Sequence, residues 1–508
     1  MMNSYGLSEK EQDEIIALFK KYPAIDEVIL FGSRAMNTFS ATSDIDFAVK
    51  GDGISNIIGT LKNDFEESSL IYEVDVVDYI NISSDALIEH IEKYGKLFYR
   101  KGWVETTLGE VAEIITGQSP KGDTCNVAGN GMPLLNGPTE FGDKSPFAVQ
   151  YTIDARKKSK NEDLLFCVRG STTGRMNWAD KEYAIGRGVA AIRHKKGTEY
   201  KQFIKAIFDY KLPVLLSAAT GSIFPNVSRS QVENLEINIP PLPEQKAIAA
   251  VLSAFDDKIE LLREQNQTLE TLAQTIFKEW FVHFNFPDKD GKPYKDNGGE
   301  MVDSELGEIP KGWRVGKLGD IVKIKGGGTP STKNPDFWNG DIYWTSPKDL
   351  SNTKSIFLFD TEKKITKEGL EKISSGLLPK GTLLLSSRAP IGYLSISSMD
   401  GVAINQGYIA LIEGAYLSNS YMFFWLKTFM RLLTNFANGS TFLEISKTAF
   451  RNIDCMIPDK ITLEKFDIFV ESIFKKIKNN TAQIQTLSKT RDTLLPKLMN
   501  GEIRVQYE

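Results

Sequence analysis

Two long segments carry apolar residues at alternating spacings of four and three, the heptad pattern of helices that pack along a shared seam. They occupy residues 244–284 and 461–508, and corresponding seam positions lie 218 residues apart. The seam positions are Ile248, Leu252, Phe255, Ile259, Leu262, Asn266, Leu269, Ala273, Ile276 and Trp280, followed by Phe466, Val470, Ile473, Ile477, Asn480, Ile484, Leu487, Arg491, Leu494 and Leu498. The pattern therefore predicts two long helices whose seams pack on each other.

An asparagine interrupts each seam. Asn266 and Asn480 stand where an apolar residue would give more stability, but a polar residue at such a position fixes the register and orientation of the helices. The alternative is that the two segments are core helices of separate domains. The length and regularity of the seams favour a helix pair.

The segments that precede the helices alternate short apolar runs with glycine and proline, which is typical of short strands joined by turns. Examples are "EDLLFCVRGSTTGRM" from Glu162 and "GTLLLSSRAPIGYLSI" from Gly381. Residues 102–243 and 312–460 are therefore predicted to be mixed α/β globules rich in strands. Residues 285–311 are dense in Asp, Gly, Lys and Pro, which predicts an exposed linker.

These two globules are copies of one module. "GWVETTLGEVAEIITGQSP" from Gly102 is echoed by "GWRVGKLGDIVKIKGGGTP" from Gly312, at an offset of 210 residues. "TGSIFPNVSRSQVENLEINIP" from Thr220 is echoed by "NGSTFLEISKTAFRNIDCMIP" from Asn438, at an offset of 218. Self-similarity at fixed offsets indicates repeated structural units. We call residues 102–243 module 1 and residues 312–460 module 2.

The charge of the chain is distributed unevenly. The 508 residues carry a net charge of −5, but residues 1–101 hold 10 Lys and Arg against 18 Asp and Glu, so this segment carries −8 and the remainder +3. Binding to phosphate depends on the local field, so the acidic total leaves nucleic acid open as a partner.

Several classes of protein are excluded or disfavoured. No apolar run reaches the roughly 20 residues of a membrane span, and the polar N-terminus does not resemble a signal peptide, so we expect a cytoplasmic protein without a membrane partner. The three cysteines and three histidines are scattered without zinc-ligand or disulfide spacing. After Gly102 there is no phosphate-binding Gly-x-x-x-x-Gly-Lys-Ser/Thr loop and no methyltransferase or nuclease motif.

From about Gly102 onward the chain resembles the specificity subunits of type I restriction-modification systems. The resemblance rests on "DSELGEIPKGW", "GGGTPSTKNPDFWNGDIYWTSPKDL" from Gly326, "SRAPIGY" from Ser387, "IPPLPEQKAIAAVLSAFDDKIELLREQNQ" from Ile239 and "RDTLLPKLMNGEI" from Arg491. It implies that each module is a target recognition domain, that the helices pair antiparallel, and that the target is a bipartite double-stranded DNA sequence. Two methyltransferase subunits and restriction (translocase) subunits are the implied partners.

Module 1 lacks the tryptophan-rich stretch of module 2, so the two half-sites are expected to differ. Loops that carry Arg and Lys suit contacts with phosphates and base edges. The candidates are Lys121, Arg169, Arg175 and Arg229 in module 1, and Lys325, Lys333, Arg388 and Lys447 in module 2. The alternative for each is a solvated surface charge or a structural ion pair.

The N-terminal segment carries a different motif. The apolar strand "EVILF" leads into Gly32 and Ser33, and Asp44 and Asp46 precede a second apolar run. Alternate residues of a strand point to one face, so the two carboxylates share a face and suit Mg²⁺, which prefers oxygen ligands and clamps nucleotide phosphates. Gly32 allows close approach of a phosphate, and Ser33 can donate a hydrogen bond to it.

This segment resembles the minimal nucleotidyltransferases. The family needs a third carboxylate, which we map to Asp75 in "YEVDVVDYI"; Asp78 would face the opposite side of a regular strand. The resemblance implies Mg²⁺ and a nucleoside triphosphate, ATP, as cofactors, and transfer of AMP to a protein partner. The alternative is a degenerate domain kept as a structural or docking cap.

The predicted fold class is multidomain α/β and α+β. Its parts are a nucleotidyltransferase-like α/β domain over residues 1–101, β-rich recognition domains over 102–243 and 312–460, long antiparallel coiled-coil helices over 244–284 and 461–508, and the linker over 285–311. Two functions compete: a DNA-specificity subunit with an accessory nucleotidyltransferase domain, or a nucleotidyltransferase that uses the modules for DNA targeting. The first is favoured because it explains most of the chain.

Overall fold

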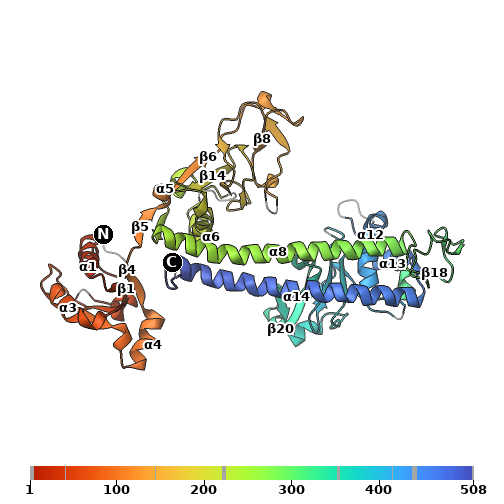
Figure 1. The fold of residues 1–508 in the computed structure, drawn as a ribbon. Coiled ribbons are helices and arrows are strands. Elements are labelled where there is room, and N and C mark those ends of the chain that lie inside the picture. The colour runs from red at the N-terminus through yellow and green to blue at the C-terminus, as the bar shows by residue number, and fades with distance from the viewer. Residues whose placement is uncertain are drawn as a thin grey trace. The chain divides into compact units, whose positions relative to one another are not determined.

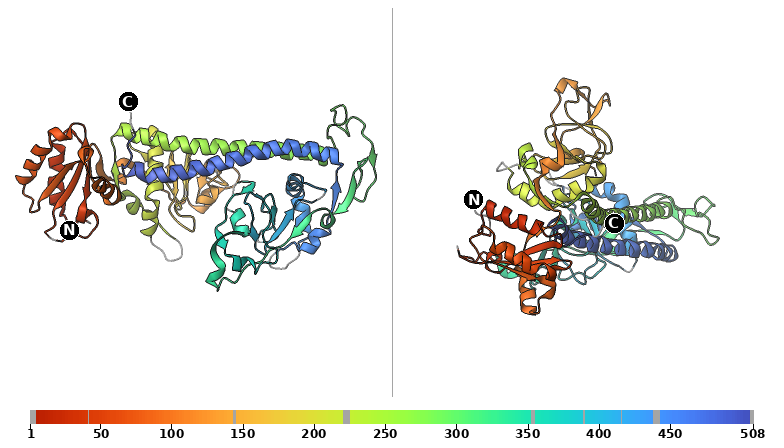
Figure 2. Two further views of the ribbon diagram at one scale, coloured as in Figure 1. Left: turned by 90° about the horizontal axis from the view of Figure 1, so that it is seen from below. Right: turned by 60° about the vertical axis from the view of Figure 1, so that its left-hand side comes forward.

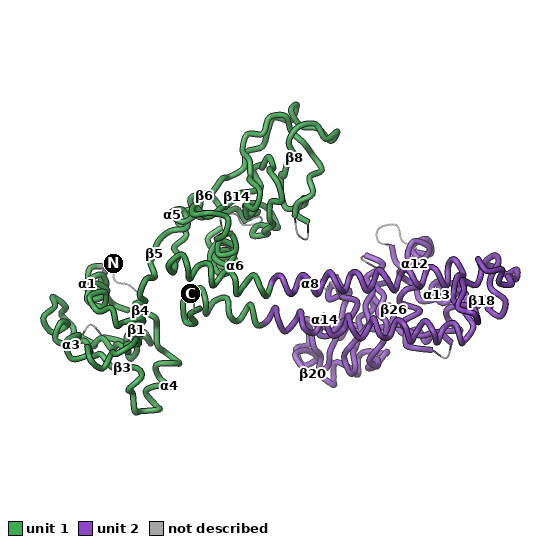
Figure 3. The backbone as a smooth tube through the Cα atoms, in the orientation of Figure 1, with its two compact units in different colours: residues 1–255, 490–508 green, residues 256–489 purple. Residues whose placement is uncertain are grey.

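The computed structural model describes residues 5–40, 42–142, 145–219, 225–351, 355–388, 390–414, 416–437 and 443–505. The chain divides into two compact units: residues 1–255 with 490–508, and residues 256–489 (Figure 3). Each unit has its own hydrophobic core. Among the described residues, no helix combines the length and the apolar character that crossing a bilayer requires.

The first unit begins with a four-stranded sheet in the order β3-β2-β1-β4. Strands β1 and β4 are labelled in Figure 1, beside α1, α3 and α4. Strands β2 and β3 pair in parallel, and β1 pairs antiparallel with both β2 and β4. The elements are α1 (Glu9–Lys20), β1 (Ile25–Phe31), α2 (Gly32–Ala35), β2 (Ile45–Gly51), α3 (Ile58–Glu66), β3 (Val74–Asp78), α4 (Asp85–Tyr94) and β4 (Lys96–Arg100).

Consecutive residues of β2 pack on opposite faces of this sheet. Phe47 lies in a buried cluster with Phe19 of α1 and Phe65 of α3, whereas Ala48 packs with Ile91 of α4. Because side chains alternate along a strand, Asp46 lies on the same face as Ala48, the face that α4 covers.

Module 1 contains a framework sheet in the order β12-β11-β14-β6 and an inserted sheet in the order β10-β13-β8-β9-β7. The framework elements are β5 (Val104–Thr107), α5 (Leu108–Val111), β6 (Ala112–Thr116), β11 (Leu164–Cys167), β12 (Met176–Trp178), β14 (Val189–His194), α6 (Lys201–Ser217), α7 (Arg229–Glu233) and β15 (Glu236–Ile239). The inserted strands are β7 (Cys125–Asn126), β8 (Met132–Leu135), β9 (Gln150–Thr152), β10 (Lys158–Ser159) and β13 (Tyr183–Ile185).

Module 2 repeats the framework, with β19-β26-β23-β24-β21 as its sheet, and carries a different inserted sheet, β22-β20-β25. The framework elements are β18 (Arg314–Lys317), α9 (Leu318–Ile321), β19 (Lys323–Lys325), β21 (Phe357–Leu358), β23 (Leu383–Ser386), β24 (Leu394–Ser397), β26 (Tyr408–Ile412), α12 (Asn419–Asn435), α13 (Lys447–Arg451) and β27 (Asp454–Ile457). The others are α10 (Pro347–Ser351), α11 (Lys367–Leu370), β20 (Trp338–Thr345), β22 (Lys363–Ile365) and β25 (Ala403–Ile404).

The two modules therefore share a four-stranded framework order, to which module 2 adds β21, in agreement with the predicted repeat. The first strand of each pairs antiparallel with the last, β5 with β15 and β18 with β27. Helices α6 and α12 each have 17 residues. The openings of the second pair of repeats, residues 220–224 and 438–442, lie outside the described residues.

Helices α8 (Leu242–Phe281) and α14 (Lys460–Met499) each have 40 residues and pack antiparallel, as predicted (Figure 2). In the first unit, Leu252 near the start of α8 joins Leu498 near the end of α14 in one cluster. In the second unit, Phe281 at the end of α8 packs on Phe466 near the start of α14, with ring centroids 5.0 Å apart. The seams therefore contact each other.

The predicted seam fails at the end of α8. Ile276 and Trp280 are only partly buried, whereas Phe277 and Phe281 are 0% and 1% exposed. The Phe277 ring lies 5.3 Å from Tyr421 of α12 and 5.8 Å from Phe466 of α14. The buried stripe is displaced because two helices, rather than one, cover this part of α8.

The segment predicted as an exposed linker, residues 285–311, is ordered. It contains the hairpin of β16 (Met301–Val302) and β17 (Ile309–Pro310). Phe286 is buried and stacks on Trp313 with ring centroids 5.3 Å apart. Apolar anchors therefore hold this polar segment on the second unit.

Candidate nucleotide site and nucleic-acid surfaces

The Gly-Ser motif lies directly after β1, beside the first residues of β2. Gly32 has φ +71°, a left-handed conformation that favours glycine. A Cβ atom on Gly32 would lie 2.2 Å from Oδ2 of Asp46, so the Asp46 carboxylate also excludes a side chain. Gly32 and Asp46, two parts of the sequence motif, thus lie side by side. The positive φ and the nearby carboxylate each require glycine at position 32.

The parallel pairing of β2 with β3 places Asp75 directly opposite Asp46. Paired residues of neighbouring strands point to the same face, so the two carboxylates are neighbours. Asp78 instead pairs with Val49, and its side chain accepts hydrogen bonds from the Ile80 amide at 3.2 Å and from Asn81 at 2.8 Å. The structure therefore brings Asp75, rather than Asp78, beside Asp46.

Burial and two neighbouring carboxylates shift the pKa of Asp46. The pKa of Asp46 is raised above its usual value, first by burial and then by the charges of Asp75 and Asp44. A cation near the three groups would relieve this repulsion. Asp75, however, forms an ion pair with Lys62 at 3.0 Å, and across the described ranges no three His, Cys, Asp or Glu side chains are grouped closely enough to hold a metal.

Arg34 was not recognised from the sequence, although it directly follows the Gly-Ser pair. Its guanidinium is 1% exposed and donates hydrogen bonds to the carbonyl oxygen of Ser43 at 2.7 Å and to that of Asp44 at 3.1 Å. It also donates to the Tyr5 carbonyl at 2.8 Å and lies 4.3 Å from the Tyr72 ring centroid. Arg34 therefore fixes the backbone that carries Asp44. Ser33 is half-buried beside it.

The four DNA-contact candidates of module 1 have different environments. Lys121 is exposed, and Nε of the exposed Arg169 donates to Oδ1 of Asn226 at 3.4 Å. Arg175 donates to the carbonyl oxygens of Pro138 and Phe141, each at 3.0 Å. Arg229 pairs with Glu233 of the next helical turn at 2.8 Å. Arg175 and Arg229 are exposed and also have partners within the protein.

The four DNA-contact candidates of module 2 also differ in their environments. Lys325 and Lys333 are exposed. Arg388 forms an ion pair with Glu444 at 3.5 Å, and the side chain of Lys447 lies against Gly326, where a Cβ atom would be 1.8 Å from Nζ. Arg388 and Arg169 correspond in the two modules, because each forms an isolated β-bridge, with Glu444 and Asn226 respectively.

Comparisons with known proteins agree with both parts of the sequence prediction. The family model described as "Type I restriction modification DNA specificity domain" matches residues 100–271 and 310–488. The model described as "Polymerase beta, Nucleotidyltransferase" matches residues 13–102. The first match covers both modules and most of the helix pair.

Curated relatives carry the same description. The chain is 33% identical over 293 residues to the type I restriction enzyme MjaIX specificity subunit of Methanocaldococcus jannaschii, a match covering 56% of this chain and 65% of that protein, just under two thirds of its length. It is 25% identical over 408 residues to the HindI specificity subunit of Haemophilus influenzae, covering 69% of this chain and 88% of that protein.

Two solved structures align with different parts of the chain. The S subunit of a type I restriction-modification system from M. genitalium aligns with 78% of this chain and 96% of its own, at 16% identity and a TM-score of 0.48. A toxin-antitoxin complex with AMP-PNP aligns with 18% of this chain and 73% of its own, at 28% identity and a TM-score of 0.16. From Arg100 onward, this chain belongs to the type I restriction-modification DNA specificity family, and a nucleotidyltransferase domain precedes that region.

Proposed function

We propose that this chain recognises a bipartite, asymmetric DNA sequence as the specificity subunit of a type I restriction-modification complex. Each module reads one half of the target, and the helix pair holds methyltransferase and restriction subunits. The proposal rests on family membership and on the architecture of the two modules. Methylation and cleavage belong to the partner subunits.

The different sheets inserted in the two modules support an asymmetric DNA target. The modules share the framework order β6, β14, β11, β12 and β19, β26, β23, β24, but a five-stranded sheet is inserted in module 1 and a three-stranded sheet in module 2. A rigid framework with variable insertions is the usual way in which one fold serves different recognition tasks. Different insertions imply different half-sites.

The helices of the second unit expose apolar side chains that suit partner docking. On α8, Leu261 and Leu272 are 45% and 46% exposed and lie eleven residues, or about three turns, apart. On α14, Ile461 and Ile468 are 66% and 72% exposed and lie about two turns apart. Each pair thus occupies one face of its helix, and we propose these faces as contacts for the partner subunits.

The test is to co-express the full chain with its methyltransferase subunit in a methylation-free host and to map modified adenines. We expect a bipartite, asymmetric motif. Deleting module 1 should remove the requirement for one half of the motif, and deleting module 2 the requirement for the other. A stable complex without methylation would contradict the proposal.

A second activity is favoured by the juxtaposition of Gly32, Asp46 and Asp75. We propose that this site transfers AMP from ATP to a hydroxyl group of a protein partner: the acceptor oxygen bonds to the α-phosphorus, pyrophosphate leaves, and the acceptor proton is released. Gly32 lets the Asp46 carboxylate lie against the backbone that follows β1, and Ser33 can donate a hydrogen bond to a phosphate.

The side chains of Asp44, Asp46 and Asp75 carry the oxygen ligands that Mg²⁺ prefers, but in the described residues they are not grouped closely enough to hold the ion without moving. These three carboxylates would hold the ion, which would supply positive charge to the phosphates. Asp75 must exchange Lys62 for the ion, since the two side chains are paired at 3.0 Å.

The test of this second activity is nucleotide labelling of co-purified partners with the full chain and with the Asp44→Asn/Asp46→Asn double variant. Labelling should require both carboxylates. The matched control is Asp52→Asn, which removes an exposed carboxylate outside the motif. Equal labelling by the double variant would overturn the assignment.

A further inference from the structure

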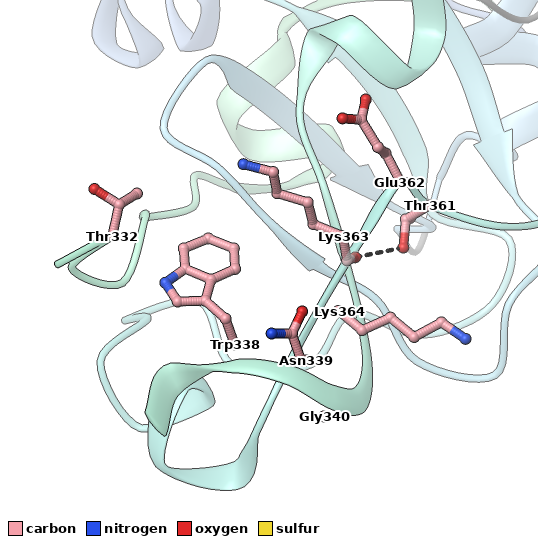
Figure 4. Close-up of a pocket in the computed structure, with 8 residues that line it drawn as sticks. All are labelled: Thr332, Trp338, Asn339, Gly340, Thr361, Glu362, Lys363 and Lys364. Atoms are coloured by element: carbon pink, nitrogen blue, oxygen red, sulfur yellow. Dashed lines mark hydrogen bonds between the residues drawn. The ribbon is translucent and has the colours of Figure 1, made fainter. Parts of the chain in front are cut away.

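A pocket of about 420 Å³ lies on the inserted sheet of module 2, between β20 and β22 (Figure 4). Its lining includes Trp338, Asn339, Thr332, Lys363 and Lys364. This lining includes part of the tryptophan-rich stretch that distinguishes module 2 from module 1. Among the DNA-contact candidates, Lys333 adjoins the pocket through its neighbour Thr332.

Asn339 is held at the pocket by a β-bulge. Both Trp338 and Ile342 oppose Ile365 of β22, so the intervening residues form an insertion in the ladder. A Cβ atom on Gly340 would lie 2.5 Å from the Ile365 carbonyl oxygen, which explains the glycine. Asn339 itself has φ +61°, a conformation that non-glycine residues rarely adopt, and its side chain is exposed. Such positions persist where the surrounding structure holds them and are common at binding sites.

The indole of Trp338 lines this pocket, and its contacts restrain its orientation. Its Nε1 atom donates a hydrogen bond to the Ser331 carbonyl oxygen at 3.1 Å. Its ring meets that of Trp344 edge to face, with centroids 5.1 Å apart. These contacts restrain the side chain before any ligand arrives, which lowers the entropy lost on binding.

Two lysines give the pocket a positive rim. Nζ of Lys363 lies 5.4 Å from the Trp338 ring centroid, and Nζ of Lys364 lies 4.8 Å from that of Tyr343. The two side chains extend in opposite directions from β22 (Figure 4). The neighbouring Glu362 carboxylate is bound by Lys348 at 2.8 Å. The Lys363 and Lys364 ammonium groups each lie over an aromatic ring. In these positions they can bind an anion.

We infer that this pocket is a DNA contact of module 2, in which the Asn339 amide hydrogen-bonds a base edge and Lys363 and Lys364 bind the flanking phosphates. The inference rests on the proposed DNA-recognition function. Asparagine matches adenine, because its amide can accept from N6 and donate to N7 in the major groove. Lysines at phosphates position a protein without reading sequence.

The test maps methylated adenines for the full chain in complex with its methyltransferase subunit, using variants at position 339. Asn339→Gly keeps the backbone unstrained at positive φ, so a change in recognition cannot come from misfolding at this residue. We expect it to relax the base preference at one position of one half-site, with discrimination reduced about 5- to 150-fold. The half-site read by module 1 should not change.

Asn339→Asp gives a sharper outcome, because a carboxylate can accept from cytosine N4 but cannot donate to adenine N7. The preferred base at that position should change. Asn435→Ala, at the end of α12, is the matched control and should leave the motif unchanged.

Lys363→Ala and Lys364→Ala should weaken binding to specific and unrelated DNA alike and lower the slope of log K against log salt by about one each. Lys380→Ala, which removes the exposed partner of Asp400, is their control. An unaltered motif in both Asn339 variants would overturn the base contact, and an unaltered salt slope would overturn the phosphate contacts. Absence of any motif with the unmodified chain would refute the proposed function itself.

Discussion

Nδ2 of Asn480 donates a hydrogen bond to Oδ1 of Asn266 at 3.0 Å, across the seam between α14 and α8. Asn480 is 1% exposed, and Nδ2 of Asn266 in turn donates to Oγ1 of Thr481 at 3.3 Å. Both amides therefore have partners on the opposite helix. Any slip of the helices by one turn would bury an amide against apolar side chains, so this pair fixes their register.

Replacing one amide should be worse than replacing both. Asn480→Leu leaves Oδ1 of Asn266 without its donor, although Nδ2 of Asn266 keeps Thr481, and should lower the free energy of unfolding by about 1–3 kcal/mol. The Asn266→Leu/Asn480→Leu double variant should recover most of this loss, because no buried amide remains unpaired. Urea unfolding monitored by circular dichroism measures both values. A double variant whose loss equals the sum of the single losses would show that the amides act independently.

A methyl group at Gly32 should damage the N-terminal domain. Gly32→Ala forces a side chain into positive φ and against the Asp46 carboxylate, 2.2 Å from the new Cβ atom. We expect a loss of about 1–3 kcal/mol of stability and loss of nucleotide transfer. Gly59→Ala on α3, where no atom lies within 4 Å of the new Cβ atom, is the control and should be neutral or stabilising. Thermal unfolding of the full chain gives the comparison.

Arg34 should resist conservative replacement. Arg34→Lys keeps the charge but cannot reach the carbonyl oxygens of Tyr5, Ser43 and Asp44 together. Leaving buried carbonyl groups unpaired should cost about 3 kcal/mol. The exposed Arg229→Lys is the matched control, and it should change stability by less than about 0.5 kcal/mol. Hydrogen exchange of residues 40–51 would report whether the loss is local.

Asp467 predicts a pH dependence in the second unit. Burial, followed by the charges of Glu413, Glu464 and Glu471, raises its pKa to about 6, although Oγ of Ser418 donates a hydrogen bond to it at 2.5 Å. The native state thus holds this proton more tightly than the unfolded chain, so ionisation destabilises the fold above about pH 6. Asp467→Asn should be more stable than the unmodified chain at pH 7.5.

The gain in stability from Asp467→Asn should shrink as the pH falls from about 6 towards 3.8. At the lower pH the Asp467 carboxyl of the unmodified native chain is protonated and carries no charge. Thermal midpoints of both proteins across this range measure the effect. Asp492→Asn, which removes an exposed carboxylate from the same helix, is the control. A difference that does not vary with pH would contradict the raised pKa.

The sequence by itself determined the features that depend on local periodicity and on repetition. Heptad spacing specified the two long helices and placed Asn266 and Asn480 within their seams, because a helix places seam residues on one side whatever surrounds it. The repeats specified the common framework of the modules. The ordered motif of Gly32, Asp44 and Asp46 specified the N-terminal domain, and strand alternation alone selected Asp75 over Asp78.

Only the tertiary structure decided the features that depend on neighbours remote in the chain. The buried stripe of α8 moves to Phe277 and Phe281 because α12 covers that end of the helix. Arg175 is engaged by two carbonyl groups more than thirty residues away, so its charge did not reveal its role. Asn339 stands at a pocket because pairing with Ile365 creates a bulge. Such contacts have no signature in local spacing, since the partners meet only when the sheets and helices pack.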